Sequence, residues 1–374
     1  MKAVLHWLPV ALSIVFLLSL AYLQRERALR GENDFVQLYT GARLVGTHDL
    51  YSRTANLAVV KATLGFAMDS VVYTRPPFYA VLLKPLALLP YRVAYAVFSL
   101  ATLSSVLWFV IRFSRECSPL PFFAAMSIPV LTAICGGQDT PFLLAILGAS
   151  VLLIRNKSDL LAGLILSLLA IKFHLFLFLP ILLLIKKRWH ILGGAAMGSA
   201  ILAGLGVFVA GADSLRQYVN VLRDPWINPS ATIMPNLHGL VATLHGDAKL
   251  ELLFVAVVVV AFLWMVWQTE SFEFLLAGSL VCGLLVSVHS GVADDIILLL
   301  VFVLVVRASS NTPLRAAAGL ILTPIPYFLV LANAPYSASL PIGLLLLLGL
   351  FCTAGLCQKA LLAPALALNI GKDI

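Results

Sequence analysis

Asp34 and Lys172 are the two residues of this chain whose types and surroundings are best suited to chemistry. Asp34 follows Gly31-Glu32-Asn33 at the start of a helical pattern, so its position predicts a helix N-cap, a role that is compatible with that of a general base. Lys172 lies in an apolar stretch, where its amine either snorkels to a membrane interface or binds a lipid phosphate. Arg75 precedes Pro76-Pro77 and could reach the same phosphate or contact lipid headgroups.

Composition identifies the setting of these charges as a membrane. The chain has 374 residues, of which 61% are hydrophobic and 11% are charged, and its mean hydropathy is +1.01. These values exclude a soluble enzyme, a disordered protein and a disulfide scaffold. The net charge of +8 comes from basic residues in short loops, where they set topology, so we predict no nucleic-acid partner.

Motifs for metals and soluble cofactors are missing from the sequence. The five cysteines form no CxxC pair, and no HExxH, P-loop, GxSxG or GxGxxG occurs. His289, Asp294 and Asp295 are not a diagnostic ligand set, and helix capping explains the two carboxylates better. We therefore predict neither a metal nor a cofactor.

Hydropathy predicts an all-α integral membrane protein with about twelve transmembrane helices, forming a single domain over residues 1–374. Its first apolar run, residues 3–23, is interpreted as an uncleaved span. With the N-terminus in the cytoplasm, most inner loops are basic, and the two long loops 24–91 and 211–249 lie outside. The expected spans are 3–23, 92–111, 120–135, 140–154, 159–171, 173–185, 190–210, 250–267, 272–288, 293–306, 314–331 and 338–357.

The first outer loop is expected to carry interfacial helices. Apolar residues recur at helical spacing from Asp34 to Gly46, which predicts an amphipathic helix on the outer membrane surface with Gly46 as its stop. Residues 76–90 are apolar but short and rich in proline. They suit a re-entrant or interfacial helix better than a full span.

Several predicted helices are too short to cross a bilayer, which needs about 20 residues. Charge parity favours two short helices between Asp159 and Ile185, which puts their junction, Lys172-Phe173-His174, below the outer surface. The segments 136–139 and 289–295 should dip inward in the same way. Irregular backbone at that depth must line a cavity, so the sequence predicts a polar cavity in the outer leaflet.

The order of short motifs along the chain resembles glycosyltransferase family 87, of the membrane-embedded GT-C class. The residues that carry the resemblance are Asp34-Phe35 with Tyr39 and Ala42, Asp49-Leu50-Tyr51, Tyr73-Thr74-Arg75-Pro76-Pro77-Phe78 with Pro85-Leu86, Gly137-Gln138, Gly163 with Lys172, and Asn228-Pro229-Ser230 leading to Asn236-Leu237-His238-Gly239-Leu240. The family often has Asn or another polar residue after the Gln, where this chain has Asp139.

The resemblance implies a GT-C-type bundle that transfers a sugar, such as mannose, from a polyprenyl monophosphate with inversion. Its aspartate base maps onto Asp34. Lys172, with Arg75 and His174, would bind the donor phosphate. The residues expected to bind sugar or acceptor are Gln138, Asp139, Asn236, His238, Tyr39 and Tyr73.

A bacterial inner membrane, with the site on the extracytoplasmic side and a glycolipid or glycan as acceptor, is the expected setting. A transporter or flippase for a lipid-linked sugar is the main alternative, because it would use the same cavity and charges. A non-catalytic subunit of an envelope complex is a further one.

Overall fold

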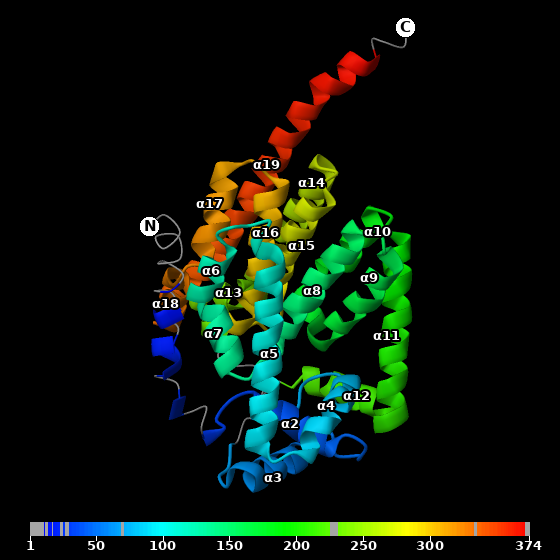
Figure 1. Cartoon of the computed structure of the whole chain (residues 1–374), viewed down its shortest axis with the longest axis vertical. Helices are drawn as coiled ribbons and strands as arrows, with labels where there is room; N and C mark the ends of the chain where they lie inside the picture. The colour runs from blue at the N-terminus through cyan, green and yellow to red at the C-terminus, as the bar shows by residue number, and fades with distance from the viewer. Residues whose placement is uncertain are drawn as a thin grey trace. The chain divides into compact units, whose positions relative to one another are not determined.

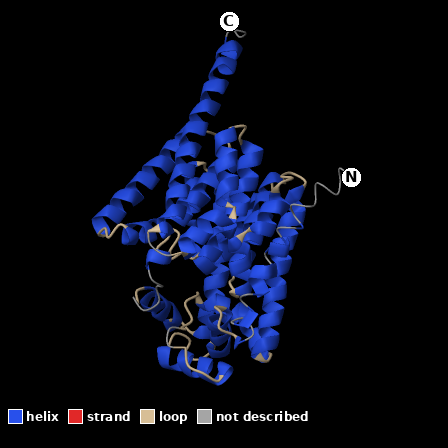
Figure 2. Cartoon of the chain, turned by 90° about the vertical axis from the view of Figure 1, so that its left-hand side faces the viewer, coloured by secondary structure: helices blue, strands red, loops and turns tan. Residues whose placement is uncertain are grey.

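The computed structural model describes residues 11, 14–16, 18–22, 25–26, 30–68, 71–224, 231–332 and 335–370. Much of the expected first span, 3–23, and the motif Asn228-Pro229-Ser230 lie outside these residues. The chain is 80% helix, and its described part contains helices and loops without strands (Figures 1 and 2). The all-helical prediction is confirmed.

The chain divides into two compact units, and the charged candidates lie in the first. Unit 1 comprises Met1–Arg112, Ile128–Phe173 and Lys187–Pro229. Its elements are α2 (Phe35–Leu44), α3 (Arg53–Leu64), α4 (Pro77–Leu83), η1 (Lys84–Leu88), most of α5 (Tyr91–Ser114), α7 (Ile128–Cys135), α8 (Thr140–Arg155), α9 (Asp159–Leu166), most of η2 (Ser167–Phe176), α11 (Trp189–Ala210) and α12 (Asp213–Leu222).

Unit 2 comprises Phe113–Ser127, His174–Lys186 and Ser230–Ile374. Its core is α15, in which twelve successive residues from Phe274 to Leu285 are buried against neighbouring helices that include α10, α14 and α16. The elements are α6 (Leu120–Met126), α10 (Phe178–Ile185), η4 (Ala231–Ile233), α13 (Leu237–Thr243), α14 (Ala248–Gln268), α15 (Phe272–Val286), η5 (Val292–Ile297), α16 (Leu298–Ala308), α17 (Thr312–Ile321), α18 (Pro324–Leu331), η6 (Tyr336–Ala338) and α19 (Ser339–Ile370).

Five helical segments in the described part are long and apolar enough to cross a membrane. They are Tyr91–Ser114, Asp159–Phe176, Trp189–Ala210, Ala248–Gln268 and Tyr336–Leu356. A sixth arises if Thr312–Ile321 and Pro324–Val330, which are bent by 50°, form one span. Other apolar helices, such as Thr140–Arg155 and Phe272–Val286, are shorter. The chain is therefore a membrane protein, with fewer full-length spans in its described part than the twelve helices expected.

The segment that carries Lys172 leaves α9 and then returns. Asp159, the first residue of α9, accepts a hydrogen bond from Arg188 at 3.2 Å, so the chain between them reverses direction. The stretch from Asp159 to Ile185 is thus not one straight helix, and its division into two short spans stays a prediction. The outgoing arm is longer than expected, since it continues to Phe176, and Lys172 interrupts it with non-helical angles, φ −134° and ψ 57°.

Close packing of glycines fixes that outgoing arm against α11. A Cβ on Gly163 would meet the carbonyl of Ile191, and one on Gly194 would meet the carbonyl of Leu160. Small residues of this kind let helix backbones approach closely in membranes. Since η2 continues directly from α9, this contact helps to determine where Lys172 lies.

The first loop folds into the protein. Helix α2 exists as expected, but its apolar face is covered by α3, α4 and η1, and not by lipid. Phe35, Leu38 and Ala42 are each at most 2% exposed. Helical periodicity revealed this apolar face without revealing that protein covers it, and the expected location of α2 at the membrane surface stays a prediction.

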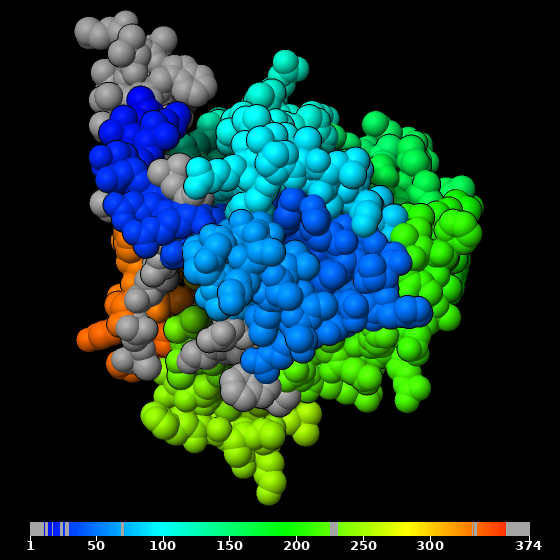
Figure 3. All heavy atoms as spheres, turned by 90° about the horizontal axis from the view of Figure 1, so that it is seen from below, coloured from blue at the N-terminus to red at the C-terminus, as the bar shows by residue number. Residues whose placement is uncertain are grey.

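Residues 77–88 form α4 and the 3₁₀ turn η1, which together are shorter than a full span. Helix α4 packs on α11, where a Cβ on Gly206 would lie 3.1 Å from the backbone nitrogen of Phe78. Figure 3 shows the surface of α2, α3 and α4 in blue beside the green of α11 and α12. The expectation that this segment is re-entrant or interfacial, and not a full span, stays a prediction.

Replacing Gly163 with Ala should destabilise the protein, because the added methyl group overlaps the backbone of α11. Overpacking of this kind costs typically about 1–3 kcal/mol. Thermal unfolding of the purified protein in detergent would measure the loss. Gly193→Ala is the matched control, because no atom lies within 4 Å of its Cβ position. Equal melting temperatures for the two variants would contradict the packing argument.

Candidate functional site

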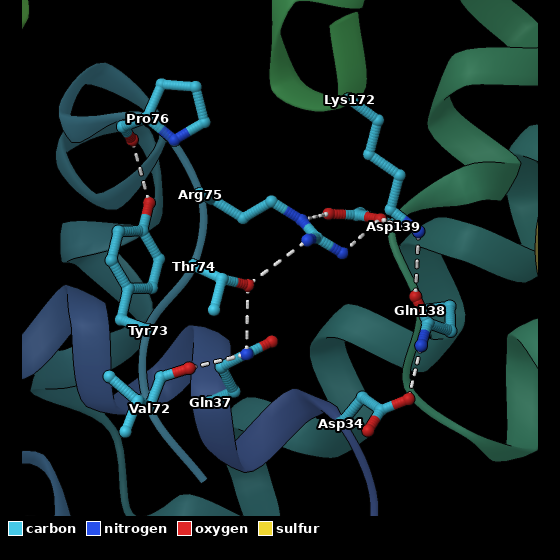
Figure 4. A network of polar contacts seen from close by, with 10 residues as sticks. All are labelled: Asp34, Gln37, Val72, Tyr73, Thr74, Arg75, Pro76, Gln138, Asp139 and Lys172. Carbon is cyan, nitrogen blue, oxygen red and sulfur yellow. Dashed lines mark hydrogen bonds and ion pairs between the residues drawn. The ribbon is translucent and has the colours of Figure 1, made fainter. Parts of the chain in front are cut away.

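Asp139 is the centre of the site and has no exposed surface. Its Oδ2 accepts a hydrogen bond from Nε of Arg75 at 2.8 Å, and its Oδ1 lies 3.5 Å from Nη2 of the same guanidinium. Nζ of Lys172 lies 3.2 Å from Oδ1. One buried carboxylate therefore holds two cations, which reach it from the loop before α4 and from the break in η2 (Figure 4).

Gln138 connects the lysine of this cluster to Asp34. Its Oε1 accepts a hydrogen bond from Nζ of Lys172 at 3.0 Å, and its Nε2 donates to Oδ2 of Asp34. Figure 4 shows the three side chains in a continuous line of contacts. The amide thus accepts from a cation at one end and donates to an anion at the other.

Asp34 occupies the N-cap position of α2, but its side chain makes no capping hydrogen bond. The oxygen Oδ1 of Asn33 accepts from the backbone nitrogen of Phe35 instead, at 3.0 Å. The backbone nitrogen of Asp34 donates to the carbonyl of Gly136 at 2.9 Å. The expectation that the Asp34 side chain caps α2 is thus wrong, and its carboxylate is directed to Gln138.

Gly137 allows the segment before α8 to approach α2. Its φ of +64° lies in the left-handed region that favours glycine. A Cβ at this position would lie 2.6 Å from Cβ of Phe35 and 3.1 Å from Oδ1 of Asn33. A larger residue would push Gln138 away from Asp34.

The backbone around Arg75 is held by side chains of the same loop. The hydroxyl of Tyr51 donates to the carbonyl of Arg75 at 2.8 Å. Nε2 of Gln37 donates to the carbonyl of Val72 and to the hydroxyl of Thr74, at 2.5 and 3.1 Å. Arg75 is therefore fixed from two sides before its guanidinium reaches Asp139.

The two carboxylates of the site differ in their electrostatics. Burial alone would raise the pKa of Asp139, but the adjacent charges of Arg75 and Lys172 bring it below its usual range. Asp34 as a whole residue is exposed to solvent. The protein atoms around its carboxylate nevertheless displace enough water to raise its pKa. The hydrogen bond from Gln138 and the charges of Lys172 and Arg75 oppose that rise. The lowered pKa favours the ionised form of Asp139, and the raised pKa makes Asp34 the stronger base.

One family model matches this chain, that of glycosyltransferase family 87, over residues 73–291. The matched stretch is more than half of the 374 residues and contains Arg75, Gln138, Asp139 and Lys172. The chain belongs to glycosyltransferase family 87. Comparison with curated proteins and with solved structures gave no match. The predicted family is confirmed. Asp34 precedes the matched stretch, so its place in the site is supported by the geometry and not by the match.

In this glycosyltransferase the structure brings together Asp34, Arg75, Gln138, Asp139 and Lys172. The two tyrosines expected beside them, Tyr39 and Tyr73, are 5% and 0% exposed. The Tyr39 hydroxyl donates to the carbonyl of Leu89 at 2.8 Å, and the Tyr73 hydroxyl donates to the carbonyl of Pro76 at 2.9 Å. These contacts give both rings a structural role in the first loop.

The other three expected site residues lie in unit 2. Asn236 is buried and caps α13, since its Oδ1 accepts from the backbone nitrogen of Gly239 at 2.9 Å. Nδ1 of His238 lies 3.0 Å from a carboxylate oxygen of Glu251. The ring of His174 lies 6.3 Å from that of His289, centroid to centroid. Their roles in sugar or phosphate binding remain predictions.

A metal site would need several His, Cys, Asp or Glu side chains close together among the described residues. No group of three or more His, Cys, Asp or Glu side chains there has a metal-binding arrangement. Oδ2 of Asp294 accepts from the backbone nitrogen of Gly291 at 2.9 Å, as expected for a helix cap.

Sequence reasoning missed Gln37 and the supporting hydrogen bonds of Thr74 and Tyr51, and it gave Asp139 a different role. One signal was available for Asp139. A carboxylate in an apolar stretch requires cations, and Arg75 and Lys172 were already candidates.

Replacing Asp34 with Asn should leave the protein at least as stable as the wild type at neutral pH. The pKa of Asp34 is raised in the folded wild type, which means that folding disfavours the ionised carboxylate. Asn carries no charge and removes that cost. The wild type gains stability as pH falls through the raised pKa, so the difference should narrow in acid. Thermal unfolding of both proteins from neutral to acidic pH measures this, with the exposed Asp49→Asn as control. A clearly less stable Asp34→Asn variant would contradict the prediction.

Proposed function

We propose that this enzyme is an inverting glycosyltransferase that moves a sugar from a polyprenyl monophosphate to an acceptor hydroxyl, with Asp34 as general base. The observation that supports it is the connection of Lys172 to Asp34 through Gln138. A cationic end suited to phosphate and a basic end suited to a hydroxyl are thereby held a fixed distance apart.

The donor phosphate binds beside Arg75 and Lys172. Its single negative charge increases as the bond between the anomeric carbon and the phosphate oxygen breaks. Fixed cations stabilise such developing charge strongly where water is excluded. His174 is proposed as a further phosphate ligand.

The acceptor hydroxyl binds beside Asp34. Its oxygen attacks the anomeric carbon from the face opposite the phosphate, and its proton passes to the Asp34 carboxylate. Inversion follows from that geometry. Positioned general bases contribute typically about 10²–10⁴-fold to rate. Sugar and acceptor contacts are proposed for Gln138, Asn236 and His238. The buried Asp139 acts through Arg75 and Lys172, and Tyr39 and Tyr73 support the first loop.

A bacterial inner membrane is the proposed location, with the site on the extracytoplasmic side of a GT-C-type bundle of about twelve helices. The polyprenyl tail stays in lipid, and the donor enters laterally between helices. The proposed sugar is a hexose such as mannose, and the acceptor is a glycolipid or glycan. Membership of a glycosyltransferase family favours this reaction over flippase activity.

Replacing Asp34 with Asn should lower transfer by about 10²–10⁴-fold while donor binding is retained, because only proton removal is lost. Transfer of radiolabelled sugar from polyprenyl phosphate and donor binding in lipid nanodiscs are the two measurements. Asp49→Asn is the control, since it changes an exposed carboxylate of the same loop. Full activity of Asp34→Asn would remove the proposed base.

Replacing Gln138 with Ala should move the acidic limb of the pH–rate profile to higher pH. The amide of Gln138 stabilises the ionised Asp34 carboxylate, so its loss raises the pKa further. Asp34 is then protonated at a higher pH, so activity is lost earlier as the solution is acidified. Gln217→Ala in α12 is the control. An unchanged limb would show that Asp34 is not the group being titrated.

A further inference from the structure

Asp139 raises a question that the proposed reaction leaves open, because a fully buried anion lies between two cations that should attract a phosphate. Its oxygens contact Arg75 at 2.8 Å and Lys172 at 3.2 Å. With no exposed surface and both oxygens already engaged, it is poorly placed to contact a substrate. Its effect on substrate must therefore pass through the cations.

We propose that Asp139 is a positioning residue that joins Arg75 and Lys172 into one phosphate receptor and sets the charge of that receptor, so that the enzyme selects a lipid monophosphate over a diphosphate. This inference rests on the proposed function.

Geometry supports the first part of the proposal. Nη2 of Arg75 and Nζ of Lys172 both lie within 3.5 Å of the same atom, Oδ1 of Asp139. Two cations held on one oxygen are close enough for one phosphate group to contact both. Without the carboxylate, their mutual repulsion would drive them apart.

Charge counting supports the second part. Arg75 and Lys172 contribute two positive charges and Asp139 one negative, so these three residues carry +1. A sugar phosphodiester carries one negative charge, which matches. A diphosphate linkage carries two and would leave an excess of negative charge in a site of low dielectric, where the cost is high.

Farnesyl phosphate and farnesyl diphosphate are suitable probes, because they share one lipid chain and differ by one phosphate. Their dissociation constants would be measured for the purified full chain in nanodiscs at constant ionic strength. Asp139→Asn should shift the affinity ratio toward the diphosphate by about tenfold or more, as expected when one negative charge a few ångströms away is removed. A fold defect by itself has no reason to favour the more highly charged ligand.

Asp159→Asn is the matched control, because it removes the carboxylate of another ion pair, with Arg188, outside the network of Figure 4. Its affinity ratio should equal that of the wild type. An unchanged ratio in folded Asp139→Asn would overturn the proposal.

A second comparison covers the case in which Asp139→Asn does not fold. Lys172→Met removes the repulsion between Lys172 and Arg75, so Asp139 is no longer needed to hold two cations together. Lys172→Met and the double variant Lys172→Met/Asp139→Asn then differ only in the charge at position 139. The double variant should favour the diphosphate by the same factor relative to Lys172→Met, and equal ratios would overturn the proposal.

If the wild type binds neither probe, the lipid-phosphate donor itself is wrong and the receptor is wrong with it. If it binds them and the ratio does not move, the role of Asp139 alone is wrong.

Discussion

An ionised carboxylate with no exposed surface is the constraint on which the site depends. Taking such a group out of water is costly unless cations and hydrogen bonds replace the solvent. For Asp139 the cations come from positions far along the chain, Arg75 and Lys172. The requirement therefore ties together the first loop, the turn before α8 and the break in η2.

Irregular backbone is what allows those three segments to meet. Pro76 and Pro77 end the extended segment that carries Arg75, Gly137 takes a left-handed conformation, and Lys172 departs from helical angles. The close packing of α9 on α11 and the burial of α2 among α3, α4 and η1 hold the segments in place.

Local sequence patterns predicted much of this arrangement. Apolar runs revealed the helices, and charge parity predicted a reversal after Lys172. Residue chemistry identified Asp34, Arg75 and Lys172, the family resemblance added Gln138, and the structure brings these four residues together. Patterns failed where the answer depends on contacts between distant segments. Nothing near α2 shows that protein covers its apolar face. Nothing near Tyr73 shows that the ring is enclosed, and the pairing of Asp139 with residues 64 and 33 positions away leaves no local trace.

The order of charges along the site fits the direction in which charge moves in the proposed reaction. Before transfer, Asp34 is an anion and the donor phosphate carries one negative charge. As the acceptor proton reaches Asp34, that carboxylate becomes neutral and the departing polyprenyl phosphate gains a second negative charge. Negative charge thus leaves the Asp34 end and accumulates at the end where Arg75 and Lys172 lie, while Gln138 spans the two. Cations placed beside Asp34 instead would stabilise the starting state and slow the reaction.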